Sequence, residues 1–312
     1  MFAAVLALAA GMSYGVADFF GGLSARSWRV FPTTLVSAAV AGTLLAVLVA
    51  VTGGAWSSPA VIGGALAALF AASGFLTFYA ALAAGPISLI APLIALLNSA
   101  VPVVWSLAGG TALRPLQWIA VAIAVAGSVL LGGERGGDRH GIRGRTLVYA
   151  VVSGLSFGFG TVALDLTPAA ARFIPVFLDA AGAAVLLGLL GLIGMLASGR
   201  PVRRWLGSFD GPVVSTHGPE APVTGGIPVP SPARSSVGVR LAIASGLLTG
   251  LANALLMLAL HSGDLAVVAV LNNLYPLSTV VLAWIVLRER LSMLQTLGAL
   301  LAVAASILLG LP

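Results

Sequence analysis

The chain has 312 residues, of which 59% are hydrophobic and only 8% are charged, and its formal net charge is +6. A soluble globular domain carries roughly 25% charged residues, so this composition excludes a protein that stays in water. Cysteine is absent, which excludes disulfides and thiolate metal sites. The composition predicts an integral membrane protein.

Ten apolar segments follow one another along the chain, each close to the ~20 residues that a helix needs to cross a bilayer. We expect helices because backbone amides in lipid must be satisfied within their own segment. The alternating pattern of barrel strands is absent from the sequence. The predicted spans are 2–23, 31–51, 60–84, 86–108, 116–132, 147–166, 173–197, 239–260, 265–287 and 293–311.

Two hydrophilic stretches interrupt this series. Residues 133–145 form a short charged connection, whereas residues 198–238 are rich in proline, glycine, serine and threonine. The second stretch has almost no apolar clustering, so it predicts a disordered cytoplasmic loop.

The basic residues, all of them arginines, are divided unequally between the two sides of the predicted bundle. One side has only Arg114 and Arg172. The other has Arg26, Arg29, Arg135, Arg139, Arg143, Arg145, Arg200, Arg203, Arg204, Arg234, Arg240, Arg288 and Arg290. Cytoplasmic loops carry the excess of arginine, so both termini are predicted outside the cytoplasm of a multi-pass cell-membrane protein. The positive charge is therefore a topology signal and does not indicate nucleic-acid binding.

The sequence also repeats itself. The GMSYG of residues 11–15 returns as GLSFG at 154–158, and residues 128–132 return at 306–310. The offset between equivalent positions is larger in the later part of the copy than in the early part, because the hydrophilic loop lies between the two parts. The offset is constant on each side of this loop, and such internal similarity indicates two copies of one structural unit.

Each copy contains five predicted spans, an odd number, so the second copy must enter the membrane from the opposite side. We therefore predict an all-α membrane protein with ten transmembrane helices in two inverted five-helix repeats. The repeats occupy residues 1–133 and 146–312, and the loop 198–238 interrupts the second. Inverted repeats are the architecture by which many secondary transporters expose a central site to either face in turn.

The end of the second copy, AVVAVLNNLYPLSTVVLAWIVLRERLSMLQTLGALLAVAASILL at 266–309, resembles the EamA-type repeat of the drug/metabolite transporter superfamily. The matching positions are Pro276, Glu289, Leu291, Gln295 and Gly298. The first copy departs from the pattern, with Asn98, Thr111 and Ala120 at the equivalents of Pro276, Glu289 and Gly298, and Arg288 replaces a usual glycine. The resemblance implies a solute transporter, in a family of exporters and importers of unrelated metabolites.

Asp18 lies inside the first predicted span, where an ionised carboxylate costs roughly 2.5–3.5 kcal/mol. Gly11, Tyr14, Gly21 and Gly22 share its face of the helix, so we expect it to point into the bundle. One hypothesis is a proton-coupling or cation-binding carboxylate. The alternative is a carboxylate at the cytoplasmic end that is hydrated or paired with a nearby arginine.

Asp179 follows Arg172 by two helical turns along the predicted seventh span. The pair favours a structural ion pair or a group reached by water, and a second proton-coupling carboxylate is the functional alternative.

Polar side chains within the spans form a further candidate group. The resemblance implies that the first, third, fourth, sixth, eighth and ninth spans line a central cavity, where amides and hydroxyls read a polar solute. Interhelical hydrogen bonding is the alternative role. Prolines 86, 92, 102 and 276 free backbone carbonyls, which either bend helices or coordinate solute. The candidate solute-binding residues are Tyr14, Tyr79, Asn98, Asn253, Asn272, Asn273 and Tyr275.

Together these features predict a secondary transporter, and specifically an exporter, of a small organic metabolite or drug-like solute. No phosphate-binding loop is present, so ATP is not the direct energy source, and no cofactor or metal is expected. Proton coupling is a further expectation, and neutral, zwitterionic or cationic solutes are favoured because the dense basic cluster lies in a loop. An integral membrane enzyme acting on lipid, or a non-transporting membrane scaffold, are the alternatives.

Overall fold

A computed structural model describes residues 1–84, 87–110, 114–132, 144–196, 235–275, 277–278, 282 and 293–310. Most of the charged connection and of the predicted 198–238 loop lies outside these residues, as do Pro276, Glu289 and Leu291. Only the last residues of that loop are described, and they are helical from Ser235 onwards. The predicted loop therefore extends too far, because the helix begins in serines before its apolar stretch.

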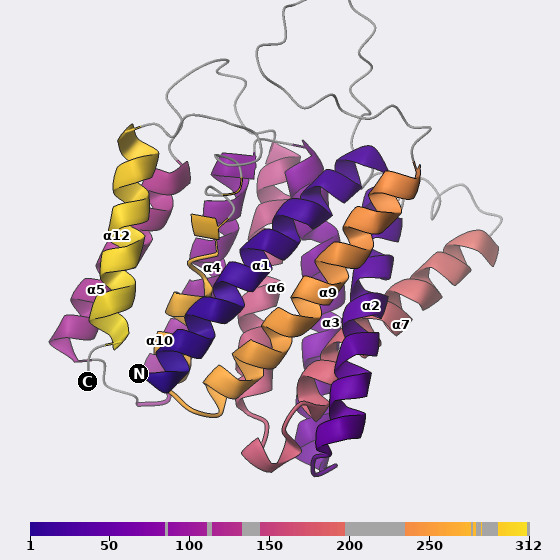
Figure 1. The fold of residues 1–312 in the computed structure, drawn as a ribbon, viewed down its shortest axis with the longest axis horizontal. Coiled ribbons are helices and arrows are strands. Elements are labelled where there is room, and N and C mark those ends of the chain that lie inside the picture. Colours follow the sequence, from indigo (N-terminus) through magenta and orange to yellow (C-terminus); the bar gives the residue numbers. More distant parts are fainter. Residues whose placement is uncertain are drawn as a thin grey trace, which may run out of the picture.

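Helices account for the regular structure of the described residues. They are α1 (Phe2–Ser27), α2 (Val30–Thr52), α3 (Ser58–Ala84), α4 (Ile87–Ala108), α5 (Pro115–Gly132), α6 (Gly144–Asp165), η1 (Ala169–Ala171), α7 (Ile174–Leu196), α9 (Ser235–Leu260), α10 (Leu265–Asn272) and α12 (Met293–Gly310). Six of those within the described ranges are long and apolar enough to cross a membrane: α1, α2, α3, α6, α7 and α9. The chain is a multi-pass membrane protein, and α1 begins at the same edge at which α12 ends (Figure 1).

The ninth predicted span, 265–287, is not continuous. Helix α10 ends at Asn272, and Asn273 to Tyr275 form a turn in which the Leu274 amide donates to the Leu271 carbonyl (3.2 Å). Residue 276 is proline, which has no N–H for the Asn272 carbonyl and disfavours helical geometry in the residue before it. The side chain of Asn273 donates to the Ala269 carbonyl (2.8 Å) and so caps the end of the helix.

Close contacts between helices depend on small residues. A Cβ at Gly11 or Gly15 of α1 would collide with the backbone carbonyl of Asn272 or Tyr275. Gly154 of α6 lies in the same way against α4. Lipid gives helices little hydrophobic drive to associate, so close packing through small residues holds such bundles together.

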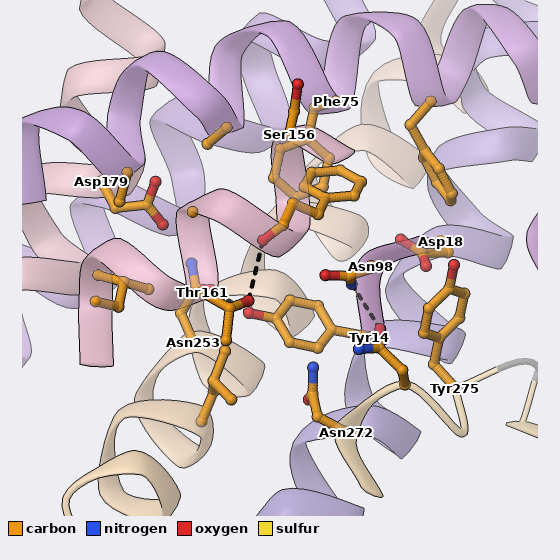
Figure 2. A pocket seen from close by; sticks show the side chains of 18 residues that line it. Tyr14, Asp18, Phe75, Asn98, Ser156, Thr161, Asp179, Asn253, Asn272 and Tyr275 are labelled. Atoms are coloured by element: carbon orange, nitrogen blue, oxygen red, sulfur yellow. Dashed lines mark hydrogen bonds between the residues drawn. The ribbon is translucent and has the colours of Figure 1, made fainter. Parts of the chain in front are cut away.

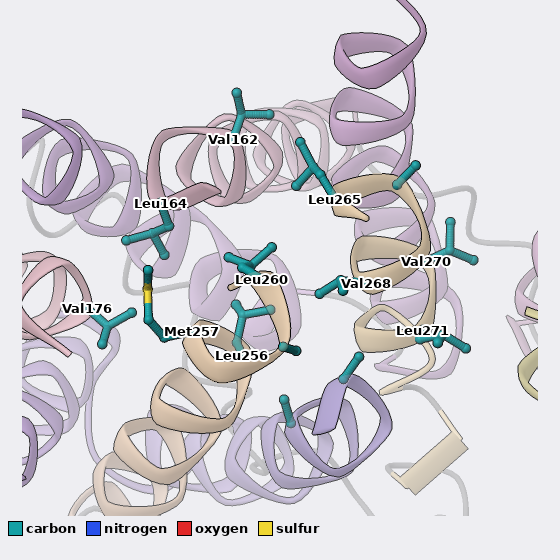
Figure 3. Close-up of a cluster of buried hydrophobic side chains, with 14 of the residues drawn as sticks. Val162, Leu164, Val176, Leu256, Met257, Leu260, Leu265, Val268, Val270 and Leu271 are labelled. Carbon is teal, nitrogen blue, oxygen red and sulfur yellow. The ribbon is translucent and has the colours of Figure 1, made fainter. Parts of the chain in front are cut away.

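The most extensive helix contacts join the early and late parts of the chain. Helix α1 packs along α9, and α3 packs along α6; α2 also contacts α9, α3 contacts α7, and α5 contacts α12. Figure 3 shows part of one apolar cluster, to which α6 contributes Leu164, α9 contributes Leu256 and Leu260, and the neighbouring α10 contributes Val268 and Leu271. This cluster fills the end of the bundle at which α6 and α9 terminate.

Candidate functional site

A cavity of about 80 Å³ lies in the middle of the bundle. Side chains from seven helices and from the turn after α10 surround it (Figure 2). Its polar lining residues are Tyr14, Asp18, Asn98, Ser156, Thr161, Asp179, Asn253, Asn272, Asn273 and Tyr275. All but two of these, Ser156 and Thr161, are candidates from the sequence.

Helix α1 contributes Tyr14 and Asp18, which lie one turn apart and both face the cavity. Asp18 is only 9% exposed, so its carboxylate points into the bundle as its position on the helix predicts. The Tyr14 hydroxyl donates to Oδ1 of Asn253 on α9. The contact between α1 and α9 brings Asn253 to this hydroxyl.

The end of α10 supplies a second polar group. Nδ2 of Asn98, on α4, donates to Oδ1 of Asn273 (2.5 Å), which joins the two helices across the cavity wall (Figure 2). Oδ1 of Asn98 and Oδ1 of Asn272 are buried and have no hydrogen-bond partner among the described residues. Buried polar atoms are nearly always paired, so these two acceptors are available to water or to a bound molecule.

Asp179 reaches the cavity from α7 and is 7% exposed, with Oδ1 lacking a hydrogen-bond partner. An ion pair with Arg172 was one role predicted for Asp179, and this prediction is wrong. Arg172 precedes α7 and has a φ of 50°, so it does not share the helical face of Asp179. Its guanidinium donates to the carbonyl of Thr52, the last residue of α2, where a cation compensates the helix end.

Tyr79 does not reach the main cavity. Its side chain is fully buried, its hydroxyl lies 3.2 Å from Oγ of Ser245, and its ring occupies the space above Gly21 of α1. It lines a smaller cavity of about 10 Å³ next to the first. Tyr79 therefore shares only this smaller cavity with two of the other candidates, Asp179 and Asn253.

The motifs and the polarity of the sequence did not identify the apolar residues that line the cavity. Phe75 and Phe78 of α3 and Phe157 of α6 form it, and the rings of Phe75 and Phe157 meet edge to face with centroids 4.8 Å apart. The internal repeat carried the signal. Phe157 is the second copy's equivalent of Tyr14, and Phe75 is the first copy's equivalent of Asn253.

The same comparison identifies Thr161, which occupies the position of Asp18 in the second copy. Both side chains line the cavity, from α6 and α1 respectively. Ser156 stands in the repeated GLSFG segment, and its hydroxyl lies 3.1 Å from that of Ser73. Comparing equivalent positions of the two copies would have found Thr161, but not Ser156, whose equivalent Ser13 does not line the cavity.

The two walls of the cavity differ in charge and polarity. Helices α1, α7 and α9 and the end of α10 present two carboxylates, amides and phenols. Helix α3 presents alanine and phenylalanine side chains, and α6 presents Phe157 and Leu164 beside two hydroxyl groups. The described residues that line the cavity include no arginine, lysine or histidine. They also include no cluster of histidine and carboxylate groups suited to a metal ion.

A buried polar cavity in a bundle of membrane-length helices is typical of membrane transporters. The sequence agrees with this class, because residues 144–311 match the model of the EamA-like transporter family. The chain belongs to the EamA-like transporter family, whose members are transporters and not enzymes.

The fold is also similar to that of a protein whose crystal structure has been solved. The TM-score is 0.68 at 16% sequence identity, over 98% of this chain and 95% of the other. At this identity the likeness concerns the fold alone. No curated protein matches the chain in sequence.

Proposed function

We propose that the protein is a secondary transporter that exports a small organic solute across the cell membrane by alternating access to the central cavity. The observation that carries this proposal is the cavity between the helices, to which both the first and the second part of the chain contribute polar side chains. Membership in a transporter family supports it.

We further propose ten spans in two inverted repeats, 1–133 and 146–312. The helix contacts support this arrangement because they persist when equivalent helices are exchanged. In the two copies α1 corresponds to α6, α2 to α7, α3 to α9 and α5 to α12. The contact of α1 with α9 therefore has its counterpart in that of α6 with α3, and the contact of α2 with α9 in that of α7 with α3. Helices α5 and α12, which correspond to each other, also touch. Such exchange is expected of repeats related by a two-fold axis in the membrane plane.

The proposed orientation places both termini outside the cytoplasm. In the fold, Arg29, Arg145 and Arg240 lie at the edge where α1 ends and α6 and α9 begin. Arg114 and Arg172 belong to the opposite edge, before α5 and α7. This division repeats the asymmetry of the whole sequence and supports the positive edge as the cytoplasmic one.

Among neutral, zwitterionic and cationic solutes, the cavity favours an organic cation with an apolar or aromatic body. Asp18 and Asp179 offer negative charge, and the described lining has no cation to neutralise it. The phenyl wall gives the apolar body of the solute a surface, and a ring face attracts an ammonium group by about 0.5–2 kcal/mol.

Proton coupling follows from the same two carboxylates. A proton and a cationic solute that compete for Asp18 and Asp179 cannot both neutralise the same carboxylate, so the binding of one favours release of the other. Exchange of a proton for the solute would then use the proton gradient to drive export.

Purified protein in liposomes tests these proposals with tyramine, choline, phenylalanine and glucose as probes. Tyramine, an aromatic amine, should accumulate in vesicles that are acidic inside, more strongly than phenylalanine or glucose. Flux of glucose alone would contradict the cationic specificity but not the transporter. Absence of all flux would contradict the transporter, and chemical conversion of the vesicle lipid would favour a membrane enzyme.

A further inference from the structure

The smaller cavity next to the solute cavity has the size of a single water molecule. Its volume is about 10 Å³, and a cavity needs roughly 10–15 Å³ to hold one water. It lies between α2, α3, α7 and α9, and Asp179 and Asn253 line it together with the main cavity. Its other polar lining residues are Thr34, Ser37, Tyr79 and Thr249.

Two buried polar atoms on this lining have no hydrogen-bond partner in the part of the chain that the structure describes. They are Oδ1 of Asp179 and Oγ1 of Thr249, in residues that are 7% and 3% exposed. A buried polar group without a hydrogen bond costs about 1–3 kcal/mol, and more if it is charged. A water placed between them would satisfy both atoms, and the polar lining gives it further partners.

A chain of hydroxyl groups continues from this cavity away from the solute. Oγ of Ser37 donates to Oγ of Ser245 (3.3 Å), and the hydroxyl of Tyr79 lies 3.2 Å from the same Ser245 oxygen. The Tyr79 ring and hydroxyl pack against Gly21, three residues after Asp18 on α1. The hydroxyl groups therefore lead from the cavity of Asp179 to the surroundings of Asp18.

We propose that the smaller cavity holds one ordered water bound to Asp179 and Thr249. With the hydroxyls of Ser37, Ser245 and Tyr79, this water carries protons between Asp179 and Asp18 behind the solute cavity. The proton leaves one carboxyl group for the water, each hydroxyl accepts one proton and passes one on, and the last proton binds the other carboxylate. The hydroxyl groups are unchanged after each transfer.

This inference rests on the proposed coupling by the two carboxylates and adds a route that bound solute does not block. The titratable groups that face Asp179 are Tyr14 and Asp18 from α1 and Tyr79 from α3. The described linings contributed by α2 and α9 contain hydroxyl and amide groups instead. Proton transfer to Asp179 is therefore expected to follow the hydroxyl chain.

Infrared spectroscopy of the full-length protein in liposomes tests the route without a solute. The carboxyl band lost in Asp179→Asn reports protonated Asp179, and transfer to D2O gives its exchange rate. Thr249→Val should slow this exchange at least about tenfold, because valine has the same shape without the hydroxyl. Thr249→Ser should restore it, and Thr43→Val, at an exposed hydroxyl on α2, should have no effect.

A bulky side chain in the solute cavity distinguishes proton transfer through that cavity from proton transfer along the hydroxyl chain. Gly160 lines that cavity and has room for a side chain, since an added Cβ would meet only Phe70, at 3.6 Å. Gly160→Leu should block tyramine binding and leave the exchange of Asp179 at the wild-type rate. Exchange that stops in Gly160→Leu, or that is unchanged in Thr249→Val, would overturn the relay. So would the absence of an Asp179 carboxyl band between about pH 4 and pH 9.

The proposed transporter fails by a different result, namely a wild-type protein that moves none of the probes while its Asp179 exchange depends on Thr249.

Discussion

Helices α4 and α10 occupy equivalent places in the two copies of the repeat, yet one is continuous where the other ends. Asn98 of α4 corresponds to Pro276 in the second copy. The helix passes through Asn98, whereas α10 stops at Asn272 and turns. Proline alone does not explain the difference, since α4 continues through Pro92 and Pro102, but α10 ends where the chain approaches Pro276 and so delivers its end to the cavity.

The two arrangements place the same chemical group in different ways. Asn98 projects from an intact helix that fixes its position, whereas Asn273 belongs to a helix end that its own side chain caps. The hydrogen bond between them joins a rigid wall to a turn. We expect the turn after α10 to be the side of the cavity that adjusts to solute, since helix ends absorb conformational change more readily than helix interiors.

The largest effect is expected when α4 is given the residue of the second copy. Asn98→Pro should destabilise the fold by about 3 kcal/mol or more, because proline removes a hydrogen bond from a helix interior and clashes with the preceding turn. Thermal unfolding of the detergent-solubilised protein measures the change, with Asn98→Ala as the control. Stability equal to that of the control would show that α4 tolerates the break seen in α10.

A second test compares Asp18 with its equivalent, Thr161. Asp18→Asn should abolish accumulation driven by a pH gradient while leaving part of the equilibrium exchange of solute, because exchange does not require a titrating group. Thr161→Val should keep gradient-driven accumulation and alter only the apparent affinity. Vesicle uptake with and without a pH gradient measures both. Full accumulation in Asp18→Asn would make Asp18 structural and the protein a facilitator or exchanger.

A smaller effect is expected from the bond between the two helices. Asn273→Ala leaves the buried Nδ2 of Asn98 unpaired, which should lower stability by about 1–3 kcal/mol. The double variant Asn98→Ala/Asn273→Ala should lose less than the sum of the single variants. Denaturation of the four proteins in one detergent gives this cycle, and additive losses would indicate that the bond contributes little.

The smallest effect is expected from the long hydrophilic segment that only the second copy contains. Replacing residues 198–234 with a short glycine–serine linker should leave insertion and flux unchanged, since the first copy has no counterpart of this segment. Flux lost from well-inserted protein would reveal a role for it.

Much of the fold could be predicted because membrane insertion imposes simple rules on length and polarity. The ends of α2 and α7 lie within one residue of the expected spans, and Asp18 faces inward as its small neighbours indicated. The interruption of α10 was not predicted, since apolar residues continue through 287 and Pro276 allows either a bend or a break.

The site was harder to predict than the spans because contacts between distant helices decide it. The polarity of Tyr79 gave no indication that a hydroxyl on α9 would bind it outside the solute cavity. Arg172 and Asp179 are two turns apart in sequence, but the turn before α7 directs the arginine to α2. Phe75 and Phe157 carry no polar signal, and only their equivalence to Asn253 and Tyr14 indicates their place.

The packing of α1 on α9 and of α3 on α6 has a mechanical consequence. Each half of the chain makes its most extensive contacts with the other half, and at one edge the Ala55 amide donates to the Ala170 carbonyl (2.9 Å). The halves are interlocked and not merely tethered, so they cannot swing apart at the connection between them. In the proposed alternating access, the moving bodies would each combine helices from both halves.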